Sequence, residues 1–373
     1  MTATDVPTGS APLMLPSLAA VVQNADDNTT AIDAAAIGAP LDAPMQAVQP
    51  LGDPFPVGFE LDWLGSFADN LRLTIDVSGR VQYNSASEQW STTQFYGFDL
   101  YKVFSGPRGD IATMVLQGFA TRLGNAGQPP YFFDGPTDWQ WIWRMFFVNW
   151  RLDPRGTLNV KTGHFEMPFG LEALLDTNGT LRQVDTARNL GIKADWGVTL
   201  NGVTQDFEYE VGVGRGSGNE WRSDGDPYLV TGRIGTAREA DAWVGVSGFS
   251  GHLWRPGGAQ VRRQRVGVDT GTHCGPWTLM GQASFGTNDD VDTRHYLAEL
   301  DWQGPDDAWL VYGQVNGLQQ NTGGWQDAVK AVVGMEWAWD KHTLFSVQLI
   351  RDVTTMNDAP HATVVQMQLR YRF

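Results

Sequence analysis

Apolar and polar residues alternate through residues 361–373. The apolar set is Val365, Met367, Leu369, Tyr371 and Phe373, and the residues interleaved with it are Gln366, Gln368, Arg370 and Arg372. A period of two side chains predicts a β-strand with one apolar and one polar face. Such a strand would close a sheet whose other strands the upstream chain must supply.

Residues 71–83 show the same alternation, over a length that exceeds the five or six residues of a typical soluble strand. A tilted strand that crosses a bilayer needs about nine to eleven residues. Fourteen similar segments lie between 71–83 and 361–373, which makes about sixteen strands in all. Bacterial outer-membrane barrels have an even number of strands. The fourteen segments are predicted at 92–104, 110–122, 139–152, 156–165, 191–200, 204–215, 228–235, 240–250, 260–272, 276–286, 292–302, 307–317, 327–339 and 342–352. Which face is apolar is ambiguous at 92–104, 110–122, 139–152 and 240–250.

The connections between these segments alternate between short turns and longer loops, as in outer-membrane barrels. Turn sequences fall at 105–109, 153–155, 201–203, 236–239, 273–275, 304–306 and 340–341. The longer connections fall at 123–138, 166–190, 216–227, 251–259, 318–326 and 353–360, while those near 86–91 and 287–291 are short. The alternation places both ends of the barrel on the periplasmic side. A soluble β-sandwich or a solenoid is the alternative, but strand length and the lack of a fixed repeat argue against both.

The predicted fold class is therefore all-β, a transmembrane antiparallel β-barrel over 71–373. The chain has no apolar run of about eighteen residues, which excludes a transmembrane helix. Its 12% aromatic residues, 16 of them Trp, fit two interfacial belts. Residues 1–56 are rich in Ala, Pro, Asp and Thr and are expected to form a flexible extension, followed by a short entry segment at 57–70. We interpret the sequence as a mature chain whose signal sequence has been removed.

Composition and motifs exclude several function classes. A formal net charge of −16 argues against nucleic acid as a partner, and the single cysteine, Cys274, excludes a disulfide framework. No metal site or cofactor is predicted. The glycine-rich stretch 212–218 lacks the βαβ context of a nucleotide loop. No adjacent pair of side chains presents a catalytic site, so the chain is not expected to be an enzyme.

Three stretches carry a resemblance to a known family. Residues 161–172 read KTGHFEMPFGLE, residues 188–197 read RNLGIKADWG, and residues 207–218 read FEYEVGVGRGSG. This region resembles the phosphate-selective porin O and P family of bacterial outer-membrane porins. The resemblance implies a sixteen-stranded porin that is usually trimeric, with a long third outside loop folded into the lumen as a constriction. Phosphate selectivity is not carried over, because Glu166 stands where a basic residue would be expected and the loop has mixed charge.

The length of the third outside loop agrees with a functional role, since Pro168 and Gly170 end one strand and about twenty-five residues follow before Gly191. The predicted constriction residues are Glu166, Glu172, Asp176, Arg182, Asp185 and Arg188. A solvated outer loop is the alternative. The period of two predicts further lumen-facing residues: Arg72, Arg80, Lys161, Lys193, Arg233, Arg263, Arg265, Glu299, Asp301, Lys330, Glu336, Arg370 and Arg372. Arg262, Arg263 and Arg265 with Arg233 either form a basic ladder or pair with Asp269 or Glu299.

The expected function is a passive outer-membrane diffusion channel for small polar solutes or ions, with the lipid bilayer and two further copies of the chain as partners. The alternative is a structural or scaffold barrel that binds a periplasmic partner protein through residues 1–56. Ion sign and solute are left open.

Overall fold

The computed structural model describes residues 70–107, 109–125, 139–177, 179–221, 224–237, 240–254 and 260–373. The predicted extension at 1–56 and all of the entry segment except Asn70 lie outside these residues. Among the residues described, no helix is both long and apolar enough to cross a membrane.

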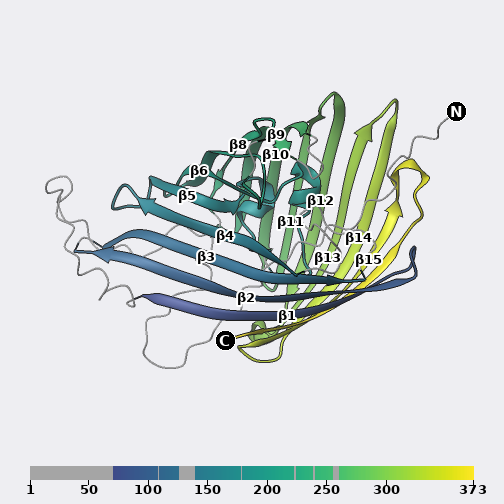
Figure 1. Cartoon of the computed structure of the whole chain (residues 1–373), viewed down its shortest axis with the longest axis horizontal. Coiled ribbons are helices and arrows are strands. Elements are labelled where there is room, and N and C mark those ends of the chain that lie inside the picture. Colours follow the sequence, from purple (N-terminus) through teal and green to yellow (C-terminus); the bar gives the residue numbers. More distant parts are fainter. Residues whose placement is uncertain are drawn as a thin grey trace.

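Sixteen antiparallel strands form one closed barrel, as predicted (Figure 1). They are β1 (Leu71–Asn84), β2 (Gln89–Gly106), β3 (Gly109–Gly124), β4 (Trp139–Arg151), β5 (Asn159–Glu166), β6 (Ala194–Val203), β7 (Phe207–Gly214), β8 (Tyr228–Thr236), β9 (Ala242–Trp254), β10 (Gln260–Cys274), β11 (Trp277–Asn288), β12 (Val291–Gln303), β13 (Trp309–Asn321), β14 (Trp325–Ala338), β15 (Thr343–Thr354) and β16 (Thr363–Arg372).

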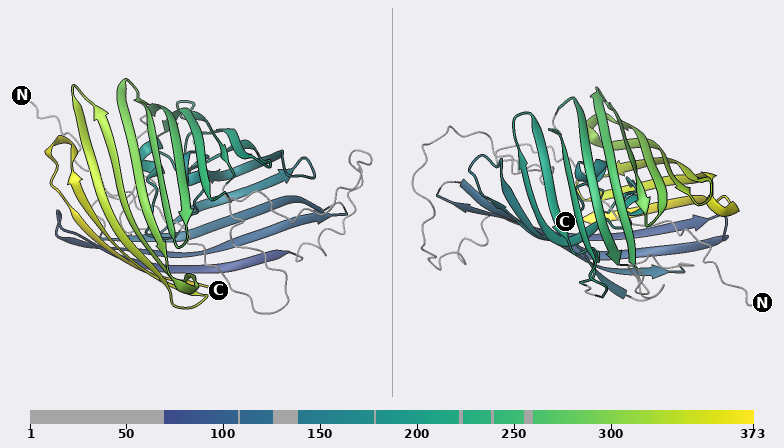
Figure 2. Two further views of the ribbon diagram at one scale, coloured as in Figure 1. Left: turned by 180° about the vertical axis from the view of Figure 1, so that it is seen from behind. Right: turned by 90° about the horizontal axis from the view of Figure 1, so that it is seen from above.

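The first and last strands close the barrel, which confirms the predicted pairing. Arg80 lies opposite Gln368, and the ladder runs from Asp76 opposite Arg372 to Asn84 opposite Val364. Figure 2 (left) shows β16 in yellow beside β1 in blue-purple. Beyond the ladder, Ile75 and Phe373 exchange two backbone hydrogen bonds of 2.8 and 3.1 Å. The sheet therefore has no free edge between its two ends.

Two of the loops predicted to be long are not. β9 continues to Trp254, while β13 continues to Asn321 and β14 begins at Trp325, so the predicted loops 251–259 and 318–326 are shorter than expected. Most residues at the ends of β13 and β14 are polar, and polar strand residues next to a connection resemble a loop in sequence. The short connections at 85–88 and 289–290 are present, as predicted.

One irregularity explains the ambiguous facing of 139–152. The β3–β4 ladder shifts register between Gln117 and Gly118, so that Arg144 and Met145 are adjacent and both buried. The β2–β3 ladder shifts only near its end, between Phe104 and Ser105, and 92–104 and 110–122 are ambiguous because their inward face also carries apolar residues, among them Phe95, Val115 and Phe119. A β-bulge adds one residue to one strand and breaks the period of two at that point. The sequence pattern therefore fails where the backbone departs from the regular ladder.

The two faces of the wall differ in chemistry. Outward positions in the middle of the strands carry exposed aliphatic side chains, such as Val246, Val268 and Val333. Exposed aromatic residues gather at both ends of the outward face, with Trp90, Trp139 and Trp325 at the end of the long loops and Trp150, Trp277, Trp339, Tyr371 and Phe373 at the end of the short turns. Inward positions are mostly polar and buried. This distribution is the one a bilayer selects.

Candidate functional site: the inner segment and the lumen wall

The chain leaves the wall after β5 and returns at β6, and we call residues 167–193, apart from residue 178, the inner segment. It contains two short helices, η2 (Gly170–Ala173) and α2 (Thr186–Leu190). The backbone N–H of Met167 donates to the carbonyl of Lys193 at 2.8 Å and closes the base of the segment. Gly170 has a φ of +57° and Gly191 one of +81°, left-handed conformations that favour glycine at both bends.

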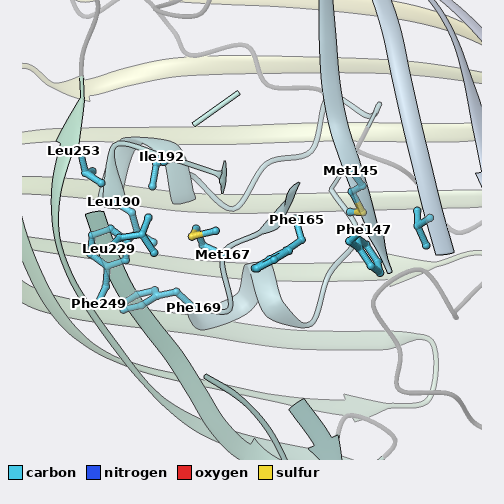
Figure 3. Close-up of a cluster of buried hydrophobic side chains, with 11 residues drawn as sticks. Met145, Phe147, Phe165, Met167, Phe169, Leu190, Ile192, Leu229, Phe249 and Leu253 are labelled. Atoms are coloured by element: carbon cyan, nitrogen blue, oxygen red, sulfur yellow. The ribbon is translucent and has the colours of Figure 1, made fainter. Parts of the chain in front are cut away.

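The base of the inner segment is held by apolar packing, drawn in Figure 3. Phe165, Met167, Phe169, Leu190 and Ile192 contribute from the segment and from the end of β5. The wall contributes Val115, Met145, Phe147, Leu229, Phe249 and Leu253. Trp243 joins a second cluster with Leu171 and Val184. These contacts explain why 240–250 was ambiguous: its inward face carries Trp243 and Phe249 because it packs on the inner segment.

Hydrogen bonds tie the rest of the inner segment to inward side chains of distant strands. Close to its start, Ser247 of β9 accepts from the N–H of Gly170 at 2.9 Å. Gln282 of β11 bridges the segment, accepting from the N–H of Leu171 at 3.0 Å and donating to the carbonyl of Val184 at 3.2 Å.

The far part of the inner segment reaches the strands that close the barrel. Arg80 of β1 donates to the carbonyl of Thr180 at 3.2 Å, and Gln368 of β16 donates to that of Gly179 at 2.5 Å. Gln314 of β13 donates to the carbonyl of Gln183 at 3.0 Å. In the closed order β1 lies opposite β9, and β13 lies opposite β5. The segment therefore contacts opposite arcs of the wall.

Arg182 forms the principal ion pair of the segment. Its Nε donates to Glu299 at 2.7 Å and its Nη2 to Asp301 at 2.5 Å, both on β12. The Glu299 side chain is fully buried and that of Asp301 nearly so. One predicted constriction residue, Arg182, therefore pairs with two predicted lumen residues, Glu299 and Asp301. Loss of this half-buried arginine would be costly, because it would leave two buried carboxylates without a cation.

A second cluster lies at the base. Nζ of Lys193 lies 3.4 Å from Glu166 and 3.1 Å from Glu172, and donates to the Thr177 hydroxyl at 2.7 Å. Asp176 belongs to the same stretch and is half-buried. Two predicted acidic constriction residues, Glu166 and Glu172, therefore pair with one predicted lumen lysine.

A third cluster surrounds α2. Arg188 lies 3.6 Å from Asp185 and donates to Asn316 at 3.1 Å and to the carbonyl of Ala328 at 2.9 Å. Arg263 and Arg265 of β10 donate to the carbonyl of Asn189, at 3.1 and 3.2 Å. These two arginines hold the end of the helix.

The remaining predicted lumen residues lie on the wall. Arg233 is paired with Glu208 at 2.9 Å and with Asp269 at 2.7 Å, which favours the pairing alternative over a basic ladder. Arg262 does not join it, because it lies in the outward register of β10. Lys161 pairs with Glu210 at 2.9 Å. Arg72 is exposed at the start of β1, Lys330 is half-buried, and Glu336 is buried.

Near the closing ladder, Arg370 pairs with Asp76, and Arg372 pairs with Asp99 at 2.5 Å. Arg144 was missed by the sequence analysis, because the bulge hides its facing. Its guanidinium lies 3.9 Å from the ring centre of Phe119.

An uncharged row was also missed. Tyr312 donates to Gln348 at 2.8 Å, Gln348 to Gln366 at 2.5 Å, and Gln366 to Gln82 at 2.5 Å. Amide side chains give no charge signal in a sequence, so only their alternation with apolar residues marks them.

The glycine-rich stretch 212–218 has an internal occupant. The carboxylate of Asp195 accepts the backbone N–H groups of Gly216, Ser217 and Gly218 at 2.5, 3.2 and 2.9 Å. Successive N–H groups of this kind form an anion-binding concavity. Here a side chain of the same chain fills it. Within the described part of the chain, no group of three or more His, Cys, Asp or Glu residues is arranged to hold a metal ion.

No protein-family model matches this sequence, and no curated protein matches it. Solved structures of the same fold include OprB of Pseudomonas putida, with 12% identity and a TM-score of 0.61 over 84% of this chain and 97% of that one. An anion-selective porin from Comamonas acidovorans has 14% identity and a TM-score of 0.58 over 81% and 99%. OmpT of Vibrio cholerae in its trimer form has 11% identity and a TM-score of 0.58 over 81% and 99%. The chain therefore has the fold of outer-membrane porins.

Proposed function

We propose that this protein is a passive diffusion channel of the bacterial outer membrane for small polar solutes or ions. The observation that carries the proposal is the division of one closed wall into an apolar outward face and a polar, charged inward face, with the inner segment held between opposite arcs. Transport through such a barrel is downhill and needs neither a cofactor nor enzymatic chemistry.

The inner segment is the proposed constriction. Glu166, Glu172, Asp176, Arg182, Asp185 and Arg188 would set its charge, and the predicted lumen residues would hydrate the wall. The likeness of residues 161–218 to the phosphate-selective porin O and P family supports this architecture. Phosphate selectivity is not part of the proposal, because the acidic residues around Lys193 outnumber it.

A homotrimer is the proposed assembly, supported by the trimer form of a structural neighbour. The scaffold alternative depends on residues 1–56, which lie outside the described part of the chain, and no contact of the described residues favours it.

Single-channel recording in planar bilayers tests the proposal. The purified barrel should give stable ohmic steps. A barrel that inserts, shown by protection from protease, but carries no current would overturn the channel and leave the scaffold alternative.

Reversal potentials in a salt gradient test the constriction. The variant Glu166→Gln/Glu172→Gln/Asp176→Asn should shift the potential toward anion selectivity, because Lys193 then has no acidic partner in this cluster. The matched control is Asp292→Asn, which removes an exposed carboxylate in the outward register of β12 and should leave the potential unchanged. An equal reversal potential in wild type and triple variant would show that the inner segment does not line the conduction path.

A further inference from the structure

Basic residues are unevenly distributed between the two faces of the wall. Most Lys and Arg residues in the described strands share the inward register. Four exposed arginines lie in the outward register, Arg122 of β3, Arg262 of β10, Arg294 of β12 and Arg351 of β15. Each is within three residues of the strand end that leads into the long loops. The other outward basic residue of these strands, Lys102, lies toward the opposite end and is buried, 5.5 Å from the Phe104 ring centre.

Three of these arginines have no acidic partner. Arg262, Arg294 and Arg351 form no ion pair with any carboxylate among the described residues. Asp289 accepts the backbone N–H of Arg262 at 2.9 Å but forms no ion pair with its guanidinium. A guanidinium left without a carboxylate on a protein of net charge −16 is available for an external anion.

Local contacts hold two of the three side chains against the wall. The guanidinium of Arg294 lies 3.9 Å from the centre of the Trp325 ring, and Nη1 of Arg351 donates to the Thr363 hydroxyl at 2.5 Å. Stacking on an aromatic ring reduces the conformational freedom of arginine and leaves its N–H edge free to donate. The aromatic belt at this end marks the depth of lipid headgroups.

We propose that Arg262, Arg294 and Arg351, together with Trp325, form a binding surface for phosphate groups of outer-leaflet lipids. We call it the outer arginine surface. An arginine fork matches a phosphate bidentately, which a lysine does not. A free phosphate ion shares this chemistry, but residues in the outward register at belt depth face lipid rather than the lumen. The inference rests on the proposed membrane location and orientation.

Binding to phosphorylated lipid tests the proposal without any variant. The full chain is placed in phosphatidylcholine nanodiscs that contain bisphosphorylated lipid A or its dephosphorylated form, and bound lipid is counted by native mass spectrometry. The phosphorylated form should be retained more strongly. Equal retention of both forms would overturn the proposal. Displacement by millimolar inorganic phosphate would also overturn it, because the site would then be one for free anions.

Variants assign the binding to these residues. Arg262 and Arg294 are two strands apart and Arg351 is three strands from Arg294, so one lipid contacts one or two of them. Each basic residue near a membrane surface contributes roughly fivefold to affinity, so Arg262→Gln/Arg294→Gln/Arg351→Gln should bind each phosphorylated lipid about five- to twenty-five-fold more weakly. The single variant Arg294→Lys keeps the charge but loses the forked guanidinium. Its affinity for phosphorylated lipid should lie between those of wild type and the triple variant. The matched control is Gln264→Ala/Thr287→Ala/Gln319→Ala, in the same register without charge, and should bind as wild type. Unchanged binding by the triple arginine variant, with its folding verified by heat-dependent gel mobility, would sink the proposal.

The lipid-binding test and the channel test can fail independently of each other. The triple arginine variant should conduct as wild type, since none of its residues faces the lumen. A conducting barrel without preference for phosphorylated lipid would refute only the outer arginine surface. A silent barrel that still prefers phosphorylated lipid would refute only the channel.

Discussion

On β10, neighbouring residues face opposite environments. Val266 and Val268 point outward with 62% and 47% of their surface exposed, whereas Arg265 and Asp269 point inward and are almost completely buried. The inward side chains are bonded to partners: Arg265 donates a hydrogen bond to Asn189, and Asp269 forms an ion pair with Arg233. The two outward valines form no such bond. In a soluble protein the two exposures would be reversed. The effect of an outward substitution on stability should therefore depend on its depth in the membrane. The effect of an inward substitution should depend on the partner that it leaves behind.

Removal of an inward charge with buried partners should have the largest effect. Arg182→Met leaves Glu299 and Asp301 without their cation and should lower the free energy of unfolding by about 3–5 kcal/mol. Urea titration in lipid vesicles measures it. Arg182→Met/Glu299→Gln/Asp301→Asn removes the stranded charges and should recover most of the loss. A single variant as stable as wild type would show that the cluster does not hold the segment.

An outward charge should cost an amount set by depth. Val268→Arg, near the middle of β10, should destabilise the barrel by about 2–4 kcal/mol. Thr272→Arg lies on the same face close to the strand end and should cost about 1 kcal/mol or less. The same titration compares the two. Equal losses would mean that the outward face of β10 does not cross a bilayer.

Glycines on the two faces should also respond differently. Gly163 of β5 has a φ of +132°, and a Cβ there would lie 2.1 Å from the carbonyl oxygen of Phe146. Gly163→Ala should cost roughly 1–3 kcal/mol in backbone strain. Gly248 faces outward, and a Cβ added there would have no atom within 4 Å, so Gly248→Ala should be nearly neutral. A neutral Gly163→Ala would contradict the close approach.

The smallest effect should come from the turn after β4, which lies outside the membrane wall. Asp153 accepts the N–H groups of Arg155 and Leu158, both at 2.7 Å, and the hydroxyl of Thr157 at 2.8 Å. Partial burial raises the pKa of Asp153, but these hydrogen bonds outweigh it and hold the pKa below its ordinary value of 3.8. The stabilisation is therefore present above pH 3.8 and is lost as the pH falls through the folded-state pKa.

Asp153→Asn should accordingly lower stability at neutral pH by about 1 kcal/mol or less, and the difference from wild type should vanish in acid. Thermal unfolding between about pH 2 and 7 measures it. Asp206→Asn, in the next turn, is the control, because Asp206 is exposed and its replacement should leave stability at neutral pH unchanged. A difference that persists at the acid end of this range would assign the effect to something other than the carboxylate.

The sequence predicts the regular part of this molecule and not its exceptions. Alternation over 71–83 and 361–373 was sufficient to predict two strands and their pairing, because one face must be apolar along the whole strand. It was insufficient around Arg144 and Met145, where a bulge points adjacent residues inward. It was also insufficient at Trp243 and Phe249, whose inward facing depends on what packs against them.

The partners of charged residues were harder to predict than their facing. The composition of residues 166–190 predicted a charged loop, and the period of β12 predicted that Glu299 and Asp301 share one face. That Arg182 lies between them depends on a contact across more than a hundred residues of sequence. Such a contact follows from the path of the inner segment, which no local pattern encodes.

The pairing of β1 with β16 has a consequence for the order of folding. Arg80 and Gln368 lie 288 positions apart and are hydrogen-bonded. Closing a loop of that length is entropically unfavourable and slow, whereas each hairpin along the wall forms between neighbours in sequence. The seam should thus form last and open first. Until it forms, both terminal strands offer unpaired backbone groups to any other strand nearby, so the interval before closure is when this chain is most exposed to aggregation.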